Sequence, residues 1–408
     1  MITFSNYSQN RKKRIQLLLG LSISLIAIYL AIDYHGPSRI DLHPDIAFGF
    51  QCLRAKELIV QEYDGSGNLW ATRGMIIYKL EKGAEAFTKY AHVPTGFSIF
   101  WLRNFTILRR LTIRPECVEM VVTEKGDICA LSAGRLWYLP HNGTKFRETL
   151  KLSHYGFGDQ GARNNGIIDI NDSTVFFGEY FGNLNRDQVR VFKSDNYCRN
   201  WWAVFRFQPG QIRHIHAIQK DPYTDKLWIL TGDTNEESIM AWSDDEFDSI
   251  EILGQGSQLW RICQLVFTED DIYWGTDTYS QKVSGIYRYN KETSVLEKLA
   301  TTEGAVFFAT RLANGTIVMT TNREGIPNES DNRTRLFVID KNNKIITFEC
   351  GTWKHNRKGF WFKFAMLRLQ RNQDGQSLAI TCLNQKEFPD GELIIISENE
   401  LLKAVKSR

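Results

Sequence analysis

The stretch KDPYTDKLWILTGD (residues 220–233), followed by SIMAWSDDEFDSIEIL (residues 238–253), decides the fold. It contains three short runs of apolar and β-branched residues, separated by turns that are rich in Asp and Gly. Such a pattern is typical of antiparallel strands joined by hairpins. RHIHAIQ (residues 213–219), directly before it, supplies a further run. The stretch therefore predicts a unit of four short strands.

Comparable units, though degenerate, recur along the chain at a spacing of roughly 45 to 50 residues. Their second to fourth strands read YDGSGNLWATRG and IIYKLEKGAEAFTKY, TEKGDICALSAG and RLWYLPHNGTKFRETL, DINDSTVFFGEY and QVRVFKSDNYCRNWWAVF, FTEDDIYWGTD and GIYRYNKETSVLEKL, LANGTIVMTTN and RLFVIDKNNKIITF, NQDGQSLAITCLN and GELIIIS. One four-stranded unit cannot bury both of its faces, whereas a closed ring of units can. We therefore predict an all-β fold, a β-propeller of seven blades. Six blades is the alternative, because the first and last units are the least complete.

The repeats place the propeller at residues 57–400 and leave a C-terminal tail at 401–408. The last unit lacks a full fourth strand. In closed propellers a strand from one terminus often completes the blade formed by the other. We expect residues 33–56 to form a linker in which IDLHPDIAFGFQ (residues 40–51) can supply that closing strand.

The N-terminus has a different composition from the rest of the chain. Residues 1–14 end in the basic cluster RKKR, and residues 15–32 form an apolar run of 18 residues without a charge. Such a run is just long enough to cross a bilayer, and the basic cluster is expected to stay in the cytoplasm. We predict a transmembrane signal anchor that places the propeller outside the cytoplasm. A cleaved signal peptide is the competing interpretation, although no small-x-small cleavage site follows the run.

Composition argues against two classes of partner. The net charge is only +3, from 50 basic and 47 acidic residues, so the chain lacks the concentrated basic surface that nucleic acid requires. The seven cysteines are scattered, without CxxC pairs or zinc-ligand spacing. We interpret them as small buried residues on strands, and we predict neither a metal nor a cofactor.

Two of the units resemble a known propeller repeat between their third and fourth strands. Ser194, Asn196, Cys198, Asn200 and Trp201 follow the register of the Asp box, and Ser243, Asp245 and Ile250 follow it more loosely. The chain thus resembles the sialidase-like (BNR repeat) β-propeller superfamily in a degenerate form. The resemblance implies a fold, because Asp boxes are structural hairpins. No Arg-Ile-Pro motif of a catalytic sialidase occurs in the chain.

An acidic residue closes the second strand in three consecutive units: Glu179, Asp233 and Asp277. The first strand of a propeller blade begins at the face to which the second strand returns. Residues at the first-strand starts should therefore share one mouth of the ring with these acids. They are Arg163 and Asn164, Arg213 and His214, and Trp260 and Arg261, with Tyr180 beside them.

This set of residues suits a glycan. Carboxylates and guanidinium groups can bridge hydroxyls, and the rings of Tyr180 and Trp260 can stack on sugar faces. We predict that the mouth binds or processes a surface or extracellular glycan, with Asp233, Asp277, Glu179 and His214 as catalytic candidates. Paired carboxylates would permit glycoside hydrolysis, and a His–Arg set would permit a lyase reaction. The alternative is that Arg–Asp pairs staple neighbouring blades and that the propeller face is a non-catalytic scaffold for a protein partner.

The motif QIRHIH (residues 211–216) raises the question of a metal. Alternation along a strand puts His214 and His216 on one side. A metal site needs a third or fourth ligand, which the sequence does not supply. We therefore expect His216 to make an interblade hydrogen bond and His214 to lie nearer the mouth.

Overall fold

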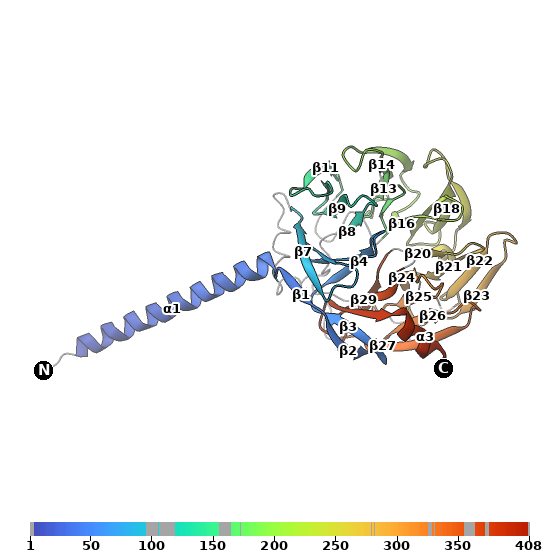
Figure 1. Ribbon diagram of the computed structural model, residues 1–408. Coiled ribbons are helices and arrows are strands. Elements are labelled where there is room, and N and C mark those ends of the chain that lie inside the picture. The colour runs from blue at the N-terminus through green and yellow to red at the C-terminus, as the bar shows by residue number, and fades with distance from the viewer. Residues whose placement is uncertain are drawn as a thin grey trace.

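The structure is a computed structural model of the 408-residue chain, and it forms a ring of seven antiparallel sheets with one long helix projecting from it (Figure 1). The prediction of seven blades is confirmed. The structure describes residues 4–94, 105, 119–154, 165–171, 173–278, 280, 282–324, 329, 331–354, 364–371 and 375–406, with the side chains of the helix described from Leu18 onward.

Blades 1 to 4 follow the chain in order, and in each the first strand is innermost. Their strands are β4 (Ile59–Tyr63), β5 (Leu69–Arg73), β6 (Ile76–Leu80) and β7 (Ala86–His92); β8 (Glu119–Val122), β9 (Ile128–Ser132), β10 (Arg135–Leu139) and β11 (Arg147–Lys151); β12 (Ile167–Asp169), β13 (Val175–Gly178), β14 (Val189–Ser194) and β15 (Trp202–Phe207); β16 (His214–Lys220), β17 (Leu227–Gly232), β18 (Ile239–Ser243) and β19 (Glu251–Gln255).

Blades 5 to 7 complete the ring, and the innermost strand of blade 7 packs beside that of blade 1. Their strands are β20 (Ile262–Phe267), β21 (Asp271–Thr276), β22 (Ile286–Asn290) and β23 (Leu296–Ala300); β24 (Val306–Arg311), β25 (Ile317–Thr321), β26 (Arg333–Ile339) and β27 (Ile345–Thr352); β28 (Met366–Leu369), β29 (Ser377–Leu383) and β30 (Glu392–Ser397).

The N-terminal segment closes the ring from both sides. Strand β3 (Phe50–Ala55) pairs antiparallel with β30 and supplies the fourth strand of blade 7, while β2 (His43–Ala47) adds a fifth at its edge. Strand β1 (Arg39–Asp41) pairs with β7 of blade 1. The closing strand thus comes from the expected segment but lies further along than residues 40–51. Burial explains the shift: Phe50 packs against Phe348, whereas β2 is largely exposed and contains Pro44, which suits an edge strand.

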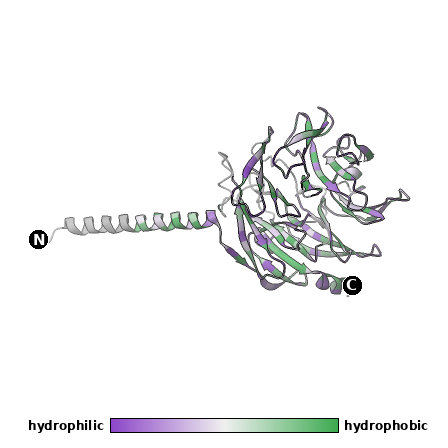
Figure 2. Cartoon of the chain, turned by 45° about the horizontal axis from the view of Figure 1, so that its top comes forward, coloured by the Kyte–Doolittle hydropathy of each residue, from purple (hydrophilic) through white to green (hydrophobic). Residues whose placement is uncertain are grey.

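Hydrophobic packing joins each blade to the next. One buried cluster, for example, combines Leu230 and Met240 of blade 4 with Leu265 and Trp274 of blade 5. Inner strands are buried on both faces, whereas outer strands such as β19 are largely exposed. Figure 2 shows how hydrophobic residues are distributed over the strands. The six described cysteines are all buried, and none forms a disulfide, as expected for small core residues.

Helix α1 (Phe4–His35) contains one stretch, Leu18–His35, that is long and apolar enough to cross a membrane. Its C-terminal end is fixed to blade 1. Arg73 donates from Nη2 to Oδ1 of Asp33 (2.8 Å) and from Nη1 to the Asp33 carbonyl (3.1 Å), and both side chains are buried. A short helix, α3 (Glu398–Lys406), ends the described chain, and its Leu401 enters the core.

The two hairpins that resemble Asp boxes have matching geometry. Ser194 donates to Oδ1 of Asn196 (3.1 Å), which also accepts from the Asn200 amide (3.0 Å). In blade 4, Ser243 donates to Oδ1 of Asp245 (2.7 Å), which also accepts from the Ser249 amide (3.0 Å). The same turn therefore recurs in two blades, whereas membership of a BNR family stays a prediction.

Candidate functional site

A bulge at the start of blade 4 brings two histidines together. His214 pairs with Gly232, but the register between β16 and β17 shifts after Ile215, so that His216 is the extra residue. The two imidazole rings lie 5.1 Å apart. Gly232 makes this possible, because a Cβ at that position would lie 2.6 Å from Cε1 of His216.

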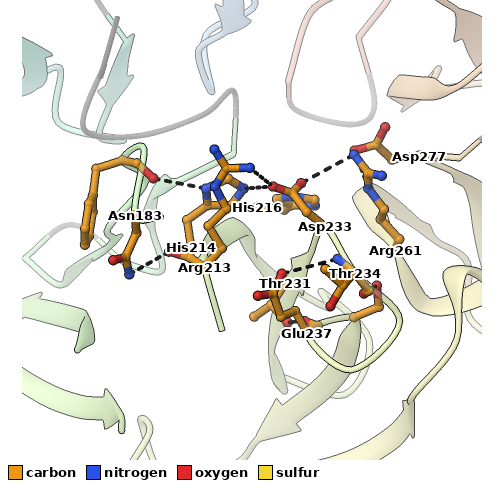
Figure 3. Close-up of polar contacts among 12 residues, drawn as sticks. Asn183, Arg213, His214, His216, Thr231, Asp233, Thr234, Glu237, Arg261 and Asp277 are labelled. Atoms are coloured by element: carbon orange, nitrogen blue, oxygen red, sulfur yellow. Dashed lines mark hydrogen bonds and ion pairs between the residues drawn. The ribbon is translucent and has the colours of Figure 1, made fainter. Parts of the chain in front are cut away.

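Asp233 follows β17 directly, on a loop that is fixed at both ends. The Thr234 amide donates to Oε2 of Glu237 (3.2 Å), and the Ile239 amide donates to Oγ1 of Thr231 (3.1 Å). Figure 3 shows how this loop holds the Asp233 carboxylate between basic side chains. The position of Asp233 is therefore set by the backbone as well as by its charged neighbours.

Four basic side chains surround the Asp233 carboxylate (Figure 3). Nη1 of Arg213 is 2.7 Å from Oδ2, and Nη2 of Arg261 is 3.4 Å from Oδ1. Nε2 of His214 is 3.6 Å from Oδ2, and Nε2 of His216 is 3.7 Å from Oδ1. Arg261 belongs to blade 5, so this constellation bridges two blades.

Hydrogen bonds to carbonyl groups set the tautomer of both histidines. Nδ1 of His214 lies 3.2 Å from the carbonyl of Phe181 in blade 3, and Nδ1 of His216 lies 3.0 Å from the carbonyl of Ile262 in blade 5. Because a carbonyl only accepts, each Nδ1 carries the proton. His216 thus makes the expected interblade bond, and His214 makes one to the other side. Both Nε2 atoms face Asp233.

Burial controls the protonation of this cluster. It lowers the pKa of His214 to about 4, so that the ring is neutral at pH 7. Burial alone would raise the pKa of Asp233, but the basic groups around its carboxylate hold it well below its usual range. Nε2 of His214 is buried and has no hydrogen-bond partner among the described residues. Oδ2 of Asp233 accepts from Nη1 of Arg213 (2.7 Å), so the buried Nε2 of His214 is the atom of this pair that lacks a partner among the described residues.

The three acids that the sequence grouped together differ in accessibility. The side chain of Asp233 is 22% exposed, and those of Arg213 and Arg261 are 30% and 23% exposed. Glu179 and Asp277 are only 3% and 2% exposed. Of these five described residues, one carboxylate and two guanidinium groups are therefore partly exposed at the mouth.

The two buried acids are engaged within their own blades. Arg190 donates to both carboxylate oxygens of Glu179, at 2.6 and 2.9 Å. Asp277 accepts from Cys263 Sγ (3.4 Å) and lies 3.3 Å from Nε of Arg261. Glu179 and Asp277 thus contribute to packing and to the position of Arg261, whereas Asp233 meets the solvent.

The remaining predicted residues have different environments. The Tyr180 ring lies 4.0 Å from that of His214 and covers it. Trp260, in the 3-10 helix η2 (Gln258–Trp260), packs on the backbone of Gly254 and lies 5.8 Å from the Trp274 ring, so it fills space between blades. Arg163 and Asn164 lie outside the described residues.

Sequence reasoning missed three residues that support the site. Asn183 donates to the carbonyl of Arg213 (3.0 Å), Gln258 donates to the carbonyl of Asp233 (3.1 Å), and Cys263 contacts Nδ1 of His216 (3.8 Å). Asn183 and Gln258 come from connections between strands, whose lengths vary from blade to blade. Position in the repeat therefore could not reveal them.

Two groups of side chains in the described part of the chain could hold a metal ion. His214, His216 and Asp233 form one, His216, Cys263 and Asp277 form the other, and in each the ligand atoms lie within 4.8 Å of one another. Arg213 and Arg261 already neutralise Asp233, and their positive charge opposes a cation at the first group. The expected absence of a metal stays a prediction.

No family model matches the chain, and no curated protein matches it. Among solved structures, an oligogalacturonate lyase from Vibrio parahaemolyticus is 9% identical with a TM-score of 0.55, and the match covers 88% of this chain and 98% of that one. The structure of U3-55K is 11% identical with a TM-score of 0.50 and the same coverage. The GH74 enzyme of Niastella koreensis is 14% identical with a TM-score of 0.49, covering 86% of this chain and 53% of that one. At these identities the likeness is one of fold: this chain is a β-propeller.

Proposed function

We propose that this protein is a membrane-anchored propeller that binds a surface or extracellular glycan at the mouth formed by Asp233, Arg213, Arg261 and His214. The observation that carries the proposal is a buried hydrogen-bonding atom, Nε2 of His214, that has no partner among the described residues. Oδ2 of Asp233 and the unpartnered Nε2 of His214 lie 3.6 Å apart. A sugar hydroxyl at this mouth would donate to Nε2 of His214 and relieve the cost of a buried unsatisfied group.

The other groups at the mouth complement a sugar. Arg213 and Arg261 are partly exposed and can donate to ring hydroxyls or to the carboxylate of an acidic sugar. Tyr180 lies over His214 and offers an aromatic ring beside it. A uronate is accordingly the first acidic sugar to test, and the fold shared with an oligogalacturonate lyase supports that choice of ligand.

Protonation states favour binding over glycoside hydrolysis. Hydrolysis needs one carboxyl group that stays protonated, but the lowered pKa of Asp233 keeps it ionised. Neutral His214 can instead accept a proton through Nε2, and Arg213 and Arg261 can hold a uronate carboxylate beside it. If the protein is an enzyme, proton abstraction is therefore the reaction that this set supports best.

Helix α1 would hold the propeller at the membrane, with the basic N-terminus in the cytoplasm and the mouth facing outward. The buried pair between Asp33 and Arg73 supports the anchoring, because it fixes the end of the apolar stretch to blade 1. The same face as a docking site for a protein partner is the rival function.

A glycan array tests the proposal, with the full chain in detergent micelles. We expect wild type to bind acidic glycans, and Asp233→Ala and His214→Ala to lose most of that binding. Asp244→Ala is the matched control, because this exposed carboxylate belongs to the same blade but contacts none of the site residues. Thermal unfolding would show that each variant folds. Absence of wild-type binding, or binding that is unchanged in both site variants, would contradict the proposal.

A further inference from the structure

We infer that the propeller has a second ligand site, at the opposite mouth of its central channel, for a small neutral polyhydroxylated molecule the size of one sugar ring. A cavity of about 290 Å³ lies there between the inner strands of blades 1 to 4 and 7. Strand β16 begins at His214 and ends at Lys220, which lines this cavity. Seven strand residues put the two mouths about 20 Å apart, so this site is separate from the Asp233 mouth.

Oppositely charged side chains in the wall of the cavity are paired with one another. Oε2 of Glu62 accepts from Nη2 of Arg371 (2.7 Å), and Oε1 of Glu62 accepts from the amide of Val122 (2.5 Å). Both side chains are buried. Lys220 forms an ion pair with Asp225, with Nζ 2.8 Å from Oδ1. These pairs leave little net charge to attract a strongly ionic ligand.

Asn165 supplies the observation that points to a ligand. Its side chain is 6% exposed, and it lines the cavity. Its backbone is held in place, because its carbonyl accepts from the Ile218 amide (2.8 Å). Nδ2 is buried and has no hydrogen-bond partner among the described residues. A buried donor without a partner costs about 1–3 kcal/mol, which a ligand acceptor would recover.

Asp169 faces the same space and can complement that donor. It makes no ion pair with any described residue, and it is only partly buried. Burial, and then the charge of Glu62, raise its pKa to about 7, although Arg371 acts in the opposite direction and Glu124 adds a smaller negative contribution. Near neutral pH its carboxyl group is therefore able either to donate or to accept. A hydroxyl group can use both modes.

Apolar side chains line the rest of the cavity, namely Val121, Ile167, Ile168, Ile218 and Pro222. A volume of this size lies at the lower end of small-molecule sites, which suits a single ring and excludes a polymer chain. The apolar wall suits the faces of a sugar ring, whose edge carries the hydroxyls that Asn165 and Asp169 would bind. This inference does not depend on the glycan proposed for the Asp233 mouth.

The test uses the full chain in detergent micelles and a panel of neutral hexoses, pentoses and inositol, followed by ligand-observed NMR. At least one member should bind at concentrations up to about 10 mM. Asn165→Leu and Asp169→Leu should each weaken it about tenfold or more, since each removes a hydrogen-bonding group from a buried site. Asp169→Asn, which preserves a donor and an acceptor, should bind within about threefold of wild type.

Matched controls separate the two mouths. Asp233→Ala should leave this binding unchanged, and Asn165→Leu should leave glycan-array binding at the Asp233 mouth unchanged. Leucine has the same number of side-chain heavy atoms and the same branching as Asn and Asp, so the variants should fold. The inference is overturned if no panel member binds, if binding survives both leucine variants, or if the site takes only cations such as ammonium compounds.

Discussion

Arg261 reaches across a blade boundary to Asp233, with Nη2 3.4 Å from Oδ1, while its Nε lies 3.3 Å from Oδ2 of Asp277 in its own blade. One guanidinium group thus links a buried acid to a partly exposed one. Arg261 thus connects two blades, and it is also a partly exposed group at the mouth.

Replacing Arg261 should lower the stability of the fold more than replacing Arg213 does. Arg261→Leu leaves Asp277 buried beside no guanidinium, and we expect a loss of about 3 kcal/mol in the free energy of unfolding. Arg213→Leu is the matched control. Among the described residues, the only ion-pair partner of Arg213 is Asp233, which is partly exposed. The free energy of unfolding should therefore fall by about 1 kcal/mol or less. Urea unfolding followed by tryptophan fluorescence measures both. Equal losses would show that Arg261 is not a structural staple.

Acid should destabilise the fold partly through His214. Its pKa falls from 6.5 to about 4 on folding, so between these values the unfolded chain binds a proton that the folded chain does not. Stability therefore decreases as pH falls through this range, by up to about 3 kcal/mol from this group. His214→Gln should show a weaker loss between pH 7 and 4 in urea titrations. His43→Gln, an exposed histidine of β2, should retain the wild-type slope.

Asp169 should give stability the opposite dependence on pH. Its pKa rises from 3.8 to about 7 on folding, so the folded chain binds the additional proton between these values, and stability decreases as pH rises. Asp169→Asn removes this penalty. It should raise the free energy of unfolding at pH 8 by up to about 4 kcal/mol and change it little at pH 4. Asp244→Asn, on the surface, should leave the free energy of unfolding unchanged at both pH values. If Asp169→Asn had the same effect at pH 8 and at pH 4, the charge of Asp169 would not be the cause.

Gly232 should not tolerate a side chain. A Cβ there would meet Cε1 of His216 at 2.6 Å and Cγ of Arg261 at 3.0 Å. We expect Gly232→Ala to cost about 1–3 kcal/mol and to disturb ligand binding at the Asp233 mouth. Gly65→Ala is the control, since its Cβ would meet nothing within 4 Å. Melting temperatures measure both, and similar values would mean that the histidine pair can move aside.

Truncation should separate the anchor from the closing strands. A fragment of residues 36–408 keeps β1, β2 and β3 and should fold, although it loses the Asp33–Arg73 pair. A fragment of residues 57–408 lacks the strand that pairs with β30, and we expect it to aggregate because that edge is apolar and exposed. Circular dichroism and size-exclusion chromatography measure the outcome. A folded, monomeric 57–408 fragment would show that ring closure does not need β3.

Much of the fold was predictable because its signals are local. Alternating apolar runs and Asp-Gly turns, repeated along the chain, predict four-stranded blades without knowledge of any long-range contact. The apolar run before residue 33 predicts α1 in the same way. Asp233 and Arg213 were also predictable, because a position within a repeat fixes a position at the mouth.

Accessibility and long-range pairing were not predictable in this way. Glu179 has the same place in its repeat as Asp233, yet Arg190 on the neighbouring strand β14 holds it buried, and only side-chain packing decides this. The shift at His216 also depends on how β16 pairs with β17.

The cavity at the opposite mouth shows most clearly why long-range pairing could not be predicted from the sequence. Glu62 and Arg371 are 309 residues apart in sequence and meet only when blade 7 closes against blade 1. The sequence by itself thus determined the repeating unit and one mouth of the ring, because both follow from short-range pattern. The tertiary structure alone decided which charges pair, which stay exposed, and what the opposite mouth contains, because these depend on ring closure.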